Sequence, residues 1–209
     1  MKARIDPAFQ KLLASFDEVN IEMHSSAVYG LWKDFSLAYF NPAWFAFAQD
    51  NGGEPSISEE WKLGRNVMEA VTSDLKEFYT GFFLSTFNDP RSQGYPKQHA
   101  YQCSSAHRYR MFNMTLYPVG VNQGILIVNS LVQEMPHPVT EVAREGNASV
   151  YTDSDGLIHQ CSHCRKVKNL QEKNRWDWIP TWVRELPANI RQELCAFCLD
   201  YHYPRKSEA

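Results

Sequence analysis

The apolar positions at the start of the chain recur with the period of a helix. Between residues 6 and 22 they fall three or four positions apart, and polar residues separate them. This spacing predicts an amphipathic helix over residues 6–22. Because one of its faces is apolar, we expect it to pack on the domain that follows or on a second copy of the chain. The apolar positions are Phe9, Leu12, Leu13, Phe16 and Val19.

Strand-like and helical patterns follow this segment. The short apolar runs 28–32 and 37–40, joined by a polar stretch, predict a hairpin. Asn41 and Pro42 favour the start of a helix, since asparagine caps helices and proline suits the first helical position. Aromatic residues at helical spacing predict a longer helix over residues 73–87, which we expect to cover a sheet.

Three further strand-like runs lie in the middle of the chain. They cover residues 97–105, 108–119 and 124–132, and short turn sequences separate them, which is typical of an antiparallel meander. Two strands, a group of helices and three more strands predict the α+β class. The expected fold is a five-stranded antiparallel sheet with helices on one face.

The pattern changes after this meander. Two prolines and the polar run behind them predict a linker. Strand-like runs on either side of the acidic turn 153–156 predict a second hairpin, and the tryptophan-rich segment 176–186 predicts a helix. The predicted parts are an N-terminal helix (1–24), a sheet domain (25–135), a linker (136–148) and a C-terminal module (149–209).

The composition is that of a soluble, folded chain. Of 209 residues, 44% are hydrophobic and 13% aromatic, which suffices for a packed core. The formal net charge is -3 with the two signs interspersed, so charge alone indicates no partner. No apolar run is long enough to span a membrane, and the N-terminus lacks the apolar core of a signal peptide. We therefore expect a cytoplasmic protein.

The five cysteines carry the strongest chemical signal. Cys161 and Cys164 form one CxxC pair, Cys195 and Cys198 form another, and Cys103 stands alone. Two such pairs supply four soft ligands that can close a tetrahedral shell around zinc. Thirty residues separate the pairs, enough for a helix between them. We predict a structural Zn²⁺ site.

Other interpretations of these cysteines remain open at this point. The four thiols could be buried without any ligand role, could form a dithiol redox switch, or could hold an iron–sulfur cluster. The cysteines, four in two close pairs and one alone, suit a reducing compartment better than they suit a secreted disulfide scaffold. Three histidines lie near the pairs, but four thiolates fill the shell, so we expect them at the surface or supporting the ligands. They are His159, His163 and His202.

The first domain resembles a known family. The run from Tyr29 to Trp32, followed by residues 37–45 with Asn41-Pro42-Ala43-Trp44-Phe45 at their end, and then the late meander, looks like a PAS sensory domain of bacterial signalling proteins. The resemblance covers about residues 25–133. It implies a sensor that holds a small molecule between its sheet and helices, or that forms a homodimer through its N-terminal helix or its sheet.

The resemblance suggests where a ligand would lie. Aromatic residues of the helices would face the inner side of the sheet, although the same residues can simply fill a core. Haem is a sharper alternative, because Cys103, His99 and His107 lie on or beside one strand. The candidate pocket residues are Trp44, Phe45, Phe82, Phe83, Cys103, His107, Phe112, Met114 and Leu116.

A second resemblance covers about residues 157–204. The pattern of Cys161-x-x-Cys164-Arg165-Lys166-Val167, two tryptophans, and Leu194-Cys195-x-x-Cys198 before Tyr201-His202-Tyr203-Pro204 is similar to a cysteine-rich segment appended to PAS or receiver modules. It implies a small zinc-ribbon-like module. Glu193 and Leu194 replace the usual approach to the second pair, which affects the backbone turn and no ligand.

These features together predict a non-enzymatic bacterial signal-transduction sensor or adaptor. Ser104, Ser105 and His107 have the residue types of a hydrolase but lack the Gly-x-Ser-x-Gly turn, and the sequence has no phosphate loop or dinucleotide fingerprint. We expect action through protein–protein association with an unidentified signalling protein. A thiol redox switch and a nucleic-acid-binding zinc-ribbon regulator are the alternatives. The candidate docking face carries Arg165, Lys166, Lys168 and Arg175.

Overall fold

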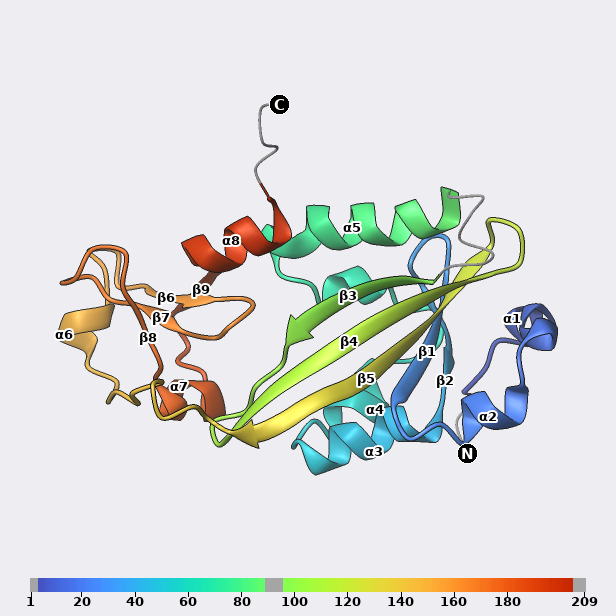
Figure 1. Cartoon of the computed structure of the whole chain (residues 1–209), viewed down its shortest axis with the longest axis horizontal. Helices are drawn as coiled ribbons and strands as arrows, with labels where there is room; N and C mark the ends of the chain where they lie inside the picture. Colours follow the sequence, from blue (N-terminus) through green and yellow to red (C-terminus); the bar gives the residue numbers. More distant parts are fainter. Residues whose placement is uncertain (1–3, 89–95, 205–209) are drawn as a thin grey trace. The chain divides into compact units, whose positions relative to one another are not determined.

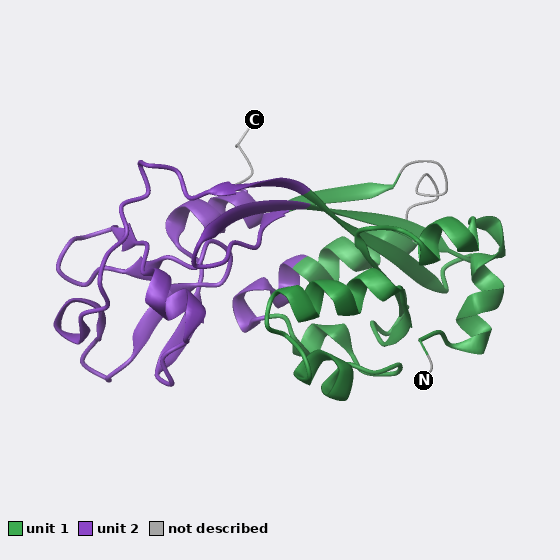
Figure 2. Ribbon diagram, turned by 90° about the horizontal axis from the view of Figure 1, so that it is seen from below, with its two compact units in different colours: residues 1–71, 79–100, 113–131 green, residues 72–78, 101–112, 132–209 purple. Residues whose placement is uncertain are grey.

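The computed structural model describes residues 4–88 and 96–204, which form two compact units (Figure 2). The predicted C-terminal module belongs to unit 2, together with the ends of three strands and the first turn of a helix. The domain boundaries near residues 136 and 148 remain a prediction. Unit 1 comprises Met1–Val71, Tyr79–Ala100 and Asn113–Leu131, and unit 2 comprises Thr72–Phe78, Tyr101–Phe112 and Val132–Ala209.

A five-stranded antiparallel sheet is the central element, as the sequence predicts. Its strands lie in the order β2-β1-β5-β4-β3 (Figure 1), and β1 pairs antiparallel with both β2 and β5. The chain thus forms a hairpin, leaves the sheet as helices, and returns as a meander beside the first strand. The strands are β1 (Ala27–Trp32), β2 (Leu37–Phe40), β3 (Lys97–Gln102), β4 (Arg108–Val119) and β5 (Gly124–Pro136).

Helices connect β2 to β3. Asn41 caps α3 as predicted, since its Oδ1 accepts hydrogen bonds from the amides of Trp44 (3.1 Å) and Val28 (2.9 Å). Asn41 therefore ties α3 to β1. No helix of the described residues is long and apolar enough to cross a membrane. The connecting helices are α3 (Pro42–Asp50), α4 (Ser56–Glu60), η2 (Val67–Glu69) and α5 (Ser73–Asn88).

The predicted N-terminal helix is three short pieces rather than one, so this prediction was wrong in its extent. They are α1 (Pro7–Leu12), η1 (Leu13–Ser15) and α2 (Glu18–Glu22). Phe16 breaks the helix with an extended backbone, and Asp17 starts a new one by accepting a hydrogen bond from Asn20 N at 3.1 Å. A tertiary contact stabilises this break, because the Phe16 ring packs edge-on against Tyr117.

The N-terminal helices pack on their own sheet. The ring of Phe9 is fully buried in a cluster with β1, β4 and β5 residues. It lies against Gly30 and Gly124, whereas Tyr29, the strand neighbour of Gly30, contacts Trp44 of α3. Successive strand residues point to opposite faces. Unit 1 therefore carries α3 and the N-terminal helices on opposite faces of the sheet, and the N-terminal helices pack on the domain that follows, one of the two positions that the sequence left open.

Unit 2 contains a four-stranded sheet of order β8-β7-β6-β9. The strand β6 pairs antiparallel with β7 and parallel with β9. The elements are α6 (Ala148–Tyr151), β6 (Ile158–Cys161), β7 (Val167–Lys168), β8 (Trp176–Asp177), α7 (Pro180–Arg184), β9 (Ile190–Glu193) and α8 (Ala196–His202).

Two local predictions in unit 2 were wrong. Residues before the acidic turn form α6 instead of a hairpin arm, because Asn147 caps that helix through Ser149 N at 3.0 Å and only Thr152 pairs with Ile158. The tryptophan-rich segment is not one helix either. Its first residues form β8, and α7 begins only at Pro180, a residue that suits a helix start.

Candidate metal centre

The parallel pairing of β6 with β9 brings the two CxxC pairs together. Cys161 ends β6 and lies opposite Glu193, the last residue of β9. Parallel strands end at the same edge of a sheet. The second pair therefore begins beside the first, and Cys195 N donates a hydrogen bond to Cys161 Sγ at 3.5 Å.

Each pair has a backbone that holds its sulfurs inward. In the first, Cys161 N donates to Lys166 O at 2.8 Å, and Arg165 turns the chain with a positive φ of 62°. In the second, Cys195 precedes α8, and Leu199 N donates to its carbonyl at 2.8 Å. Ser162 N joins the two segments by donating to Glu193 O at 3.0 Å. Glu193, at the end of β9, thus links the two segments through its carbonyl group.

The four sulfurs are spaced like the ligands of one ion. All four side chains are buried, and their Sγ atoms lie within 4.8 Å of one another. The Cys164 and Cys195 sulfurs are 3.9 Å apart. A tetrahedral zinc site with Zn–S bonds of about 2.3 Å places its sulfurs about 3.8 Å apart, whereas a disulfide needs about 2.0 Å. This cluster can hold a metal ion.

The protonation of the four thiols also favours a bound cation. Hydrogen bonds from Cys164, Cys195 and Cys198 hold the pKa of the Cys161 thiol far below its ordinary value. The same proximity, led by Cys161, raises the pKa of Cys164. One thiolate is therefore stabilised at the expense of its neighbour, because like charges at this distance repel. Only a cation among the sulfurs lets all four ionise together.

A histidine pair adjoins the cluster. His163 Nδ1 and His202 Nε2 are 2.7 Å apart, and Gln102 N donates to His163 Nε2 at 3.4 Å. His202 is buried and contacts His163, so of the two positions expected for it, at the surface or supporting the ligands, it is not at the surface. His159 instead bonds to Asp153 (2.8 Å) and Glu193 (3.1 Å). In the sequence, the only signal for this histidine pair is that both histidines lie close to a cysteine pair.

A small core lies beside the metal centre. It contains Tyr151, Ile158, Val167 and Ile179, and Trp182 packs edge-on against Tyr151. A polar network crosses it, in which Asp177 accepts hydrogen bonds from Tyr151 Oη (3.0 Å), Asn169 Nδ2 (2.8 Å) and Arg175 Nε (2.8 Å). Asp177 itself is buried. This network helps to fix the strands that carry the cysteines.

Loss of the Asp177 carboxylate is expected to destabilise unit 2. In Asp177→Ala, Tyr151 and Asn169 lose a buried partner and Arg175 loses one of its two ion pairs, which costs about 3 kcal/mol. Urea unfolding followed by tryptophan fluorescence measures this change. Asp155→Ala removes an exposed carboxylate of the same module and serves as the matched control. Equal stability of the two variants would contradict the role of the network.

The same carboxylate adds a pH dependence. Burial alone would raise the pKa of Asp177, but the hydrogen bonds from Asn169, Arg175 and Tyr151 outweigh it and hold the pKa below the ordinary 3.8. A pKa lowered on folding stabilises the protein above the unfolded value, and this contribution disappears as the pH falls through the folded value. When the pH is lowered below about 4, the free energy of unfolding of Asp177→Asn should therefore fall less than that of the wild type.

The predicted basic docking face is largely neutralised within unit 2. Lys166 pairs with Glu141 at 2.7 Å and Lys168 with Glu193 at 3.3 Å. Arg175 pairs with both Glu172 and Asp177. Such pairs leave little net positive charge for phosphate groups.

A cavity of about 340 Å³ opens beside the second cysteine pair. Trp176, Trp178 and His137 contribute to its walls, and Cys164 and Cys198 line it too. His137 Nε2 lies 2.9 Å from Ser105 O and therefore carries the proton, and its ring packs on Trp178 with centroids 4.4 Å apart. The cavity is thus lined by aromatic rings and by thiols.

The candidate ligand-pocket residues of the sheet domain are divided between the two units. In unit 1, Trp44 packs on Tyr29 and Phe40, and Phe83 packs on Phe35. These contacts are those of a filled core. Phe45 lies against Phe40, Phe82 against Phe83 and His99, and Met114 and Leu116 are buried, while Cys103, His107 and Phe112 belong to unit 2.

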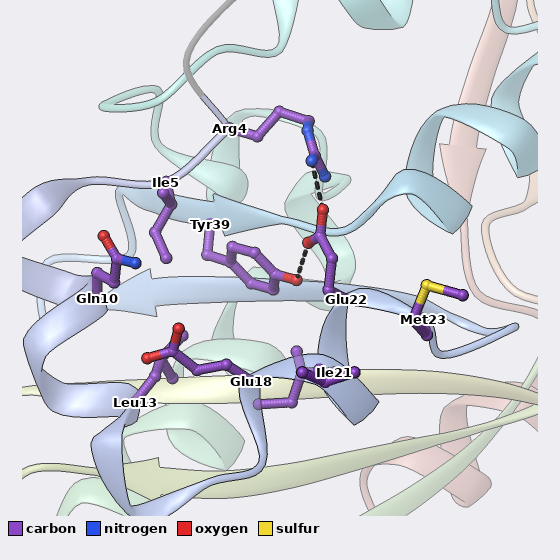
Figure 3. Close-up of a pocket in the computed structure, with 10 residues that line it drawn as sticks. Arg4, Ile5, Gln10, Leu13, Glu18, Ile21, Glu22, Met23 and Tyr39 are labelled. Carbon is purple, nitrogen blue, oxygen red and sulfur yellow. Dashed lines mark hydrogen bonds and ion pairs between the residues drawn. The ribbon is translucent and has the colours of Figure 1, made fainter.

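Unit 1 has a different cavity, of about 440 Å³, between the N-terminal helices and β2 (Figure 3). Glu22 lies between Arg4 and Tyr39, accepting a hydrogen bond from each, and the Tyr39 bond measures 2.9 Å. Burial and the Glu22 hydrogen bond raise the pKa of Tyr39. The other walls are mainly apolar, from Ile5, Leu13, Val19, Ile21 and Met23. Sequence analysis did not indicate this cavity.

Solved structures similar to this chain include the PAS domain of BvgS from Bordetella pertussis, which is 18% identical in sequence and has a TM-score of 0.42, over 57% of this chain and 85% of that one. No protein-family model matches the sequence, and no curated protein matches it.

Proposed function

We propose that this chain is a non-enzymatic sensor or adaptor of bacterial signal transduction, in which a PAS-like domain is joined to a module stapled by structural zinc. The observation that carries the proposal is the cluster of four buried sulfurs within 4.8 Å of one another. The sheet order β2-β1-β5-β4-β3, with helices inserted between β2 and β3, supports the sensory part. The chain would then act through association with another protein.

Zinc is the ion that this donor set favours. Thiolates are soft ligands, and four of them in a tetrahedron suit zinc in structural sites. Zinc supplies no redox chemistry there and acts as a cross-link. The two segments that it would join are far apart in sequence, and the core beside them is small. The ion would therefore contribute much of the free energy that folds the module.

The interior of unit 1 gives the sensory function a second support. Trp44 Nε1 and Asn129 Oδ1 are inaccessible to solvent and have no hydrogen-bond partner among the described residues. Buried polar atoms of this kind are rare and costly, so a water or a small polar molecule would satisfy them. Tyr29, whose pKa is raised by burial, lies beside both residues.

Native mass spectrometry of protein purified without added metal tests the proposal. We expect a mass increase of one zinc ion per chain, which denaturation removes, and the same spectrum reports any retained small molecule and the oligomeric state. Cys103→Ser should keep the zinc, because Cys103 lies outside the cluster. A folded protein without metal would refute the zinc assignment, and a visible absorption spectrum would reveal haem or an iron–sulfur cluster instead.

A thiol redox switch remains the second candidate, and one observation favours it. The Cys164 and Cys195 sulfurs are close enough that a modest movement could join them. Zinc content measured in the reduced and in the oxidised protein separates the two candidates. A structural site keeps its zinc under mild oxidation, whereas a switch releases it. Nucleic-acid binding is less favoured, because the basic residues already have acidic partners.

Association is proposed to use exposed apolar side chains. On α8, Phe197 is 81% exposed, and Leu199 and Tyr201 are also exposed. On the N-terminal helices, Val19 (70%) and Met23 (78%) project from α2 and would suit a homodimer through that segment. The oligomeric state in the native mass spectrum tests the dimer.

A further inference from the structure

The segment between the first two cysteines touches the start of α5. Ser162 Oγ lies 2.7 Å from one carboxylate oxygen of Asp74 and 3.0 Å from the other, and its hydroxyl donates to that carboxylate. Asp74 is in the first turn of α5, which belongs to unit 2. Hydrogen bonds to charged acceptors are among the stronger ones in proteins. The first CxxC turn is therefore fastened to the helix start.

The segment behind the second cysteine pair touches the same turn. Tyr203 Oη donates to the carbonyl of Asp74 at 2.8 Å and accepts from Phe78 N at 3.2 Å. The Phe78 ring stands edge-on to His202, with ring centroids 4.7 Å apart. Tyr203 thus contacts two successive turns of α5, at Asp74 and at Phe78. Its position is set by α8, which starts at the second cysteine pair.

The histidine pair joins these two contacts. Gln102 N donates to His163 Nε2, so Nε2 is the acceptor, and His163 Nδ1 carries the proton that it donates to His202 Nε2. His163 lies between Cys161 and Cys164, and His202 lies four residues after Cys198. The contacts to α5 therefore come from both halves of the cluster, and they coincide only when the two halves are held together.

We infer that metal occupancy of the cysteine cluster controls whether the first turn of α5 is anchored. The inference rests on the proposed function in requiring that an ion fills the cluster. With the ion bound, Ser162 and Tyr203 are both positioned against Asp74. Without it, the two CxxC segments lose their cross-link, and the helix start loses its braces. The helix continues past Phe78 as Tyr79–Asn88, so its beginning is the part that responds to the metal.

Hydrogen–deuterium exchange followed by mass spectrometry tests this link in the full chain. Ser162→Ala and Tyr203→Phe should each keep one zinc per chain, because neither residue is a ligand. In both zinc-loaded variants, amides 75–79 should exchange at least about five times faster than in the wild type, because each variant loses at least one hydrogen bond of about 1 kcal/mol. Amides 82–87, later in the same helix, should be unchanged.

A control variant tests whether loss of any hydroxyl group in the module has the same effect. Ser154→Ala removes an exposed hydroxyl from a turn of the same module. It should leave the exchange of amides 75–79 at the wild-type rate. Removing zinc from the wild type with a chelator should speed these amides by at least the same factor.

The outcomes separate this inference from the function on which it rests. If the wild type holds zinc but Ser162→Ala and Tyr203→Phe leave the first turn fully protected, the anchoring is refuted and the zinc module stands. If amides 75–79 exchange equally fast with and without zinc, the dependence on the metal is refuted. If no zinc is ever present, the proposed function fails, and the inference fails with it.

Discussion

Replacing Cys161 by serine is expected to abolish zinc binding and unfold the cysteine module. Structural zinc sites with thiolate ligands contribute about 10–16 kcal/mol of apparent binding free energy at pH 7, which is more than the small adjoining core can supply. Cys198→Ser should have the same effect from the other half of the cluster. Three tryptophans of the module report its folding, so near-ultraviolet circular dichroism and zinc analysis measure the result.

Cys103 provides the matched control for this experiment. It is a free cysteine of the same unit, and its sulfur is not one of the clustered four. Cys103→Ser should therefore keep one zinc per chain and the wild-type tryptophan spectrum. Retention of the spectrum by metal-free Cys161→Ser would mean that the cysteines are ordinary core residues and that the metal has no structural role.

Phe9→Ala is expected to be the most destabilising single change in unit 1. The ring is fully buried, packs edge-on against Trp32, and fills the space above Gly30 and Gly124. Removing a buried phenylalanine side chain costs about 3–5 kcal/mol, because a cavity remains. Loss of the ring should also release α1 from the sheet. Urea unfolding, followed by circular dichroism, measures the change in free energy.

The glycines beneath the ring make this prediction sharper. A Cβ at residue 30 would lie 2.4 Å from Phe9 Cε1, and one at residue 124 would lie 2.7 Å from Phe9 Cε2 and 2.9 Å from the carbonyl oxygen of Leu31. Gly30→Ala should cost about 1–3 kcal/mol through overpacking, and Gly124→Ala should cost more, since backbone cannot move aside.

A double-mutant cycle checks that the ring is the cause. Gly30→Ala should cost less in the Phe9→Ala background than in the wild type, because the added methyl group then enters vacated space. Gly81→Ala is the control, since nothing lies within 4 Å of its Cβ position, and it should stabilise α5 by about 0.5–1 kcal/mol. Strict additivity of the two changes would show that the ring and the glycine do not interact.

The sheet and its local signals could be predicted from the sequence because they depend on neighbouring residues. Asn41 shows this, since its capping of α3 follows from its residue type and from Pro42 behind it. The five strands could be predicted from alternation and turn residues for the same reason. The break at Phe16 could not, because helical spacing continues through it and only a distant partner, Tyr117, favours the extended backbone.

The site divides in the same way. The spacing of the cysteines predicted a four-thiol group, since each CxxC turn places two sulfurs on one side. The parallel register of β6 with β9, which sets Cys161 beside Cys195, is a long-range pairing with no local signal. The contacts of Ser162 and Tyr203 with Asp74 likewise join residues more than eighty positions apart.

The sequence by itself determined which residues carry metal-binding chemistry and that a five-stranded antiparallel sheet precedes them. Both follow from residue type and short-range spacing, which the chain carries at every stage of folding. Only the tertiary structure decided that the N-terminal helices cover the second face of the sheet, where Phe9 meets two glycines. It also decided that the cysteine cluster is braced against the first turn of α5. Such contacts depend on which distant segments meet, and that is settled by packing.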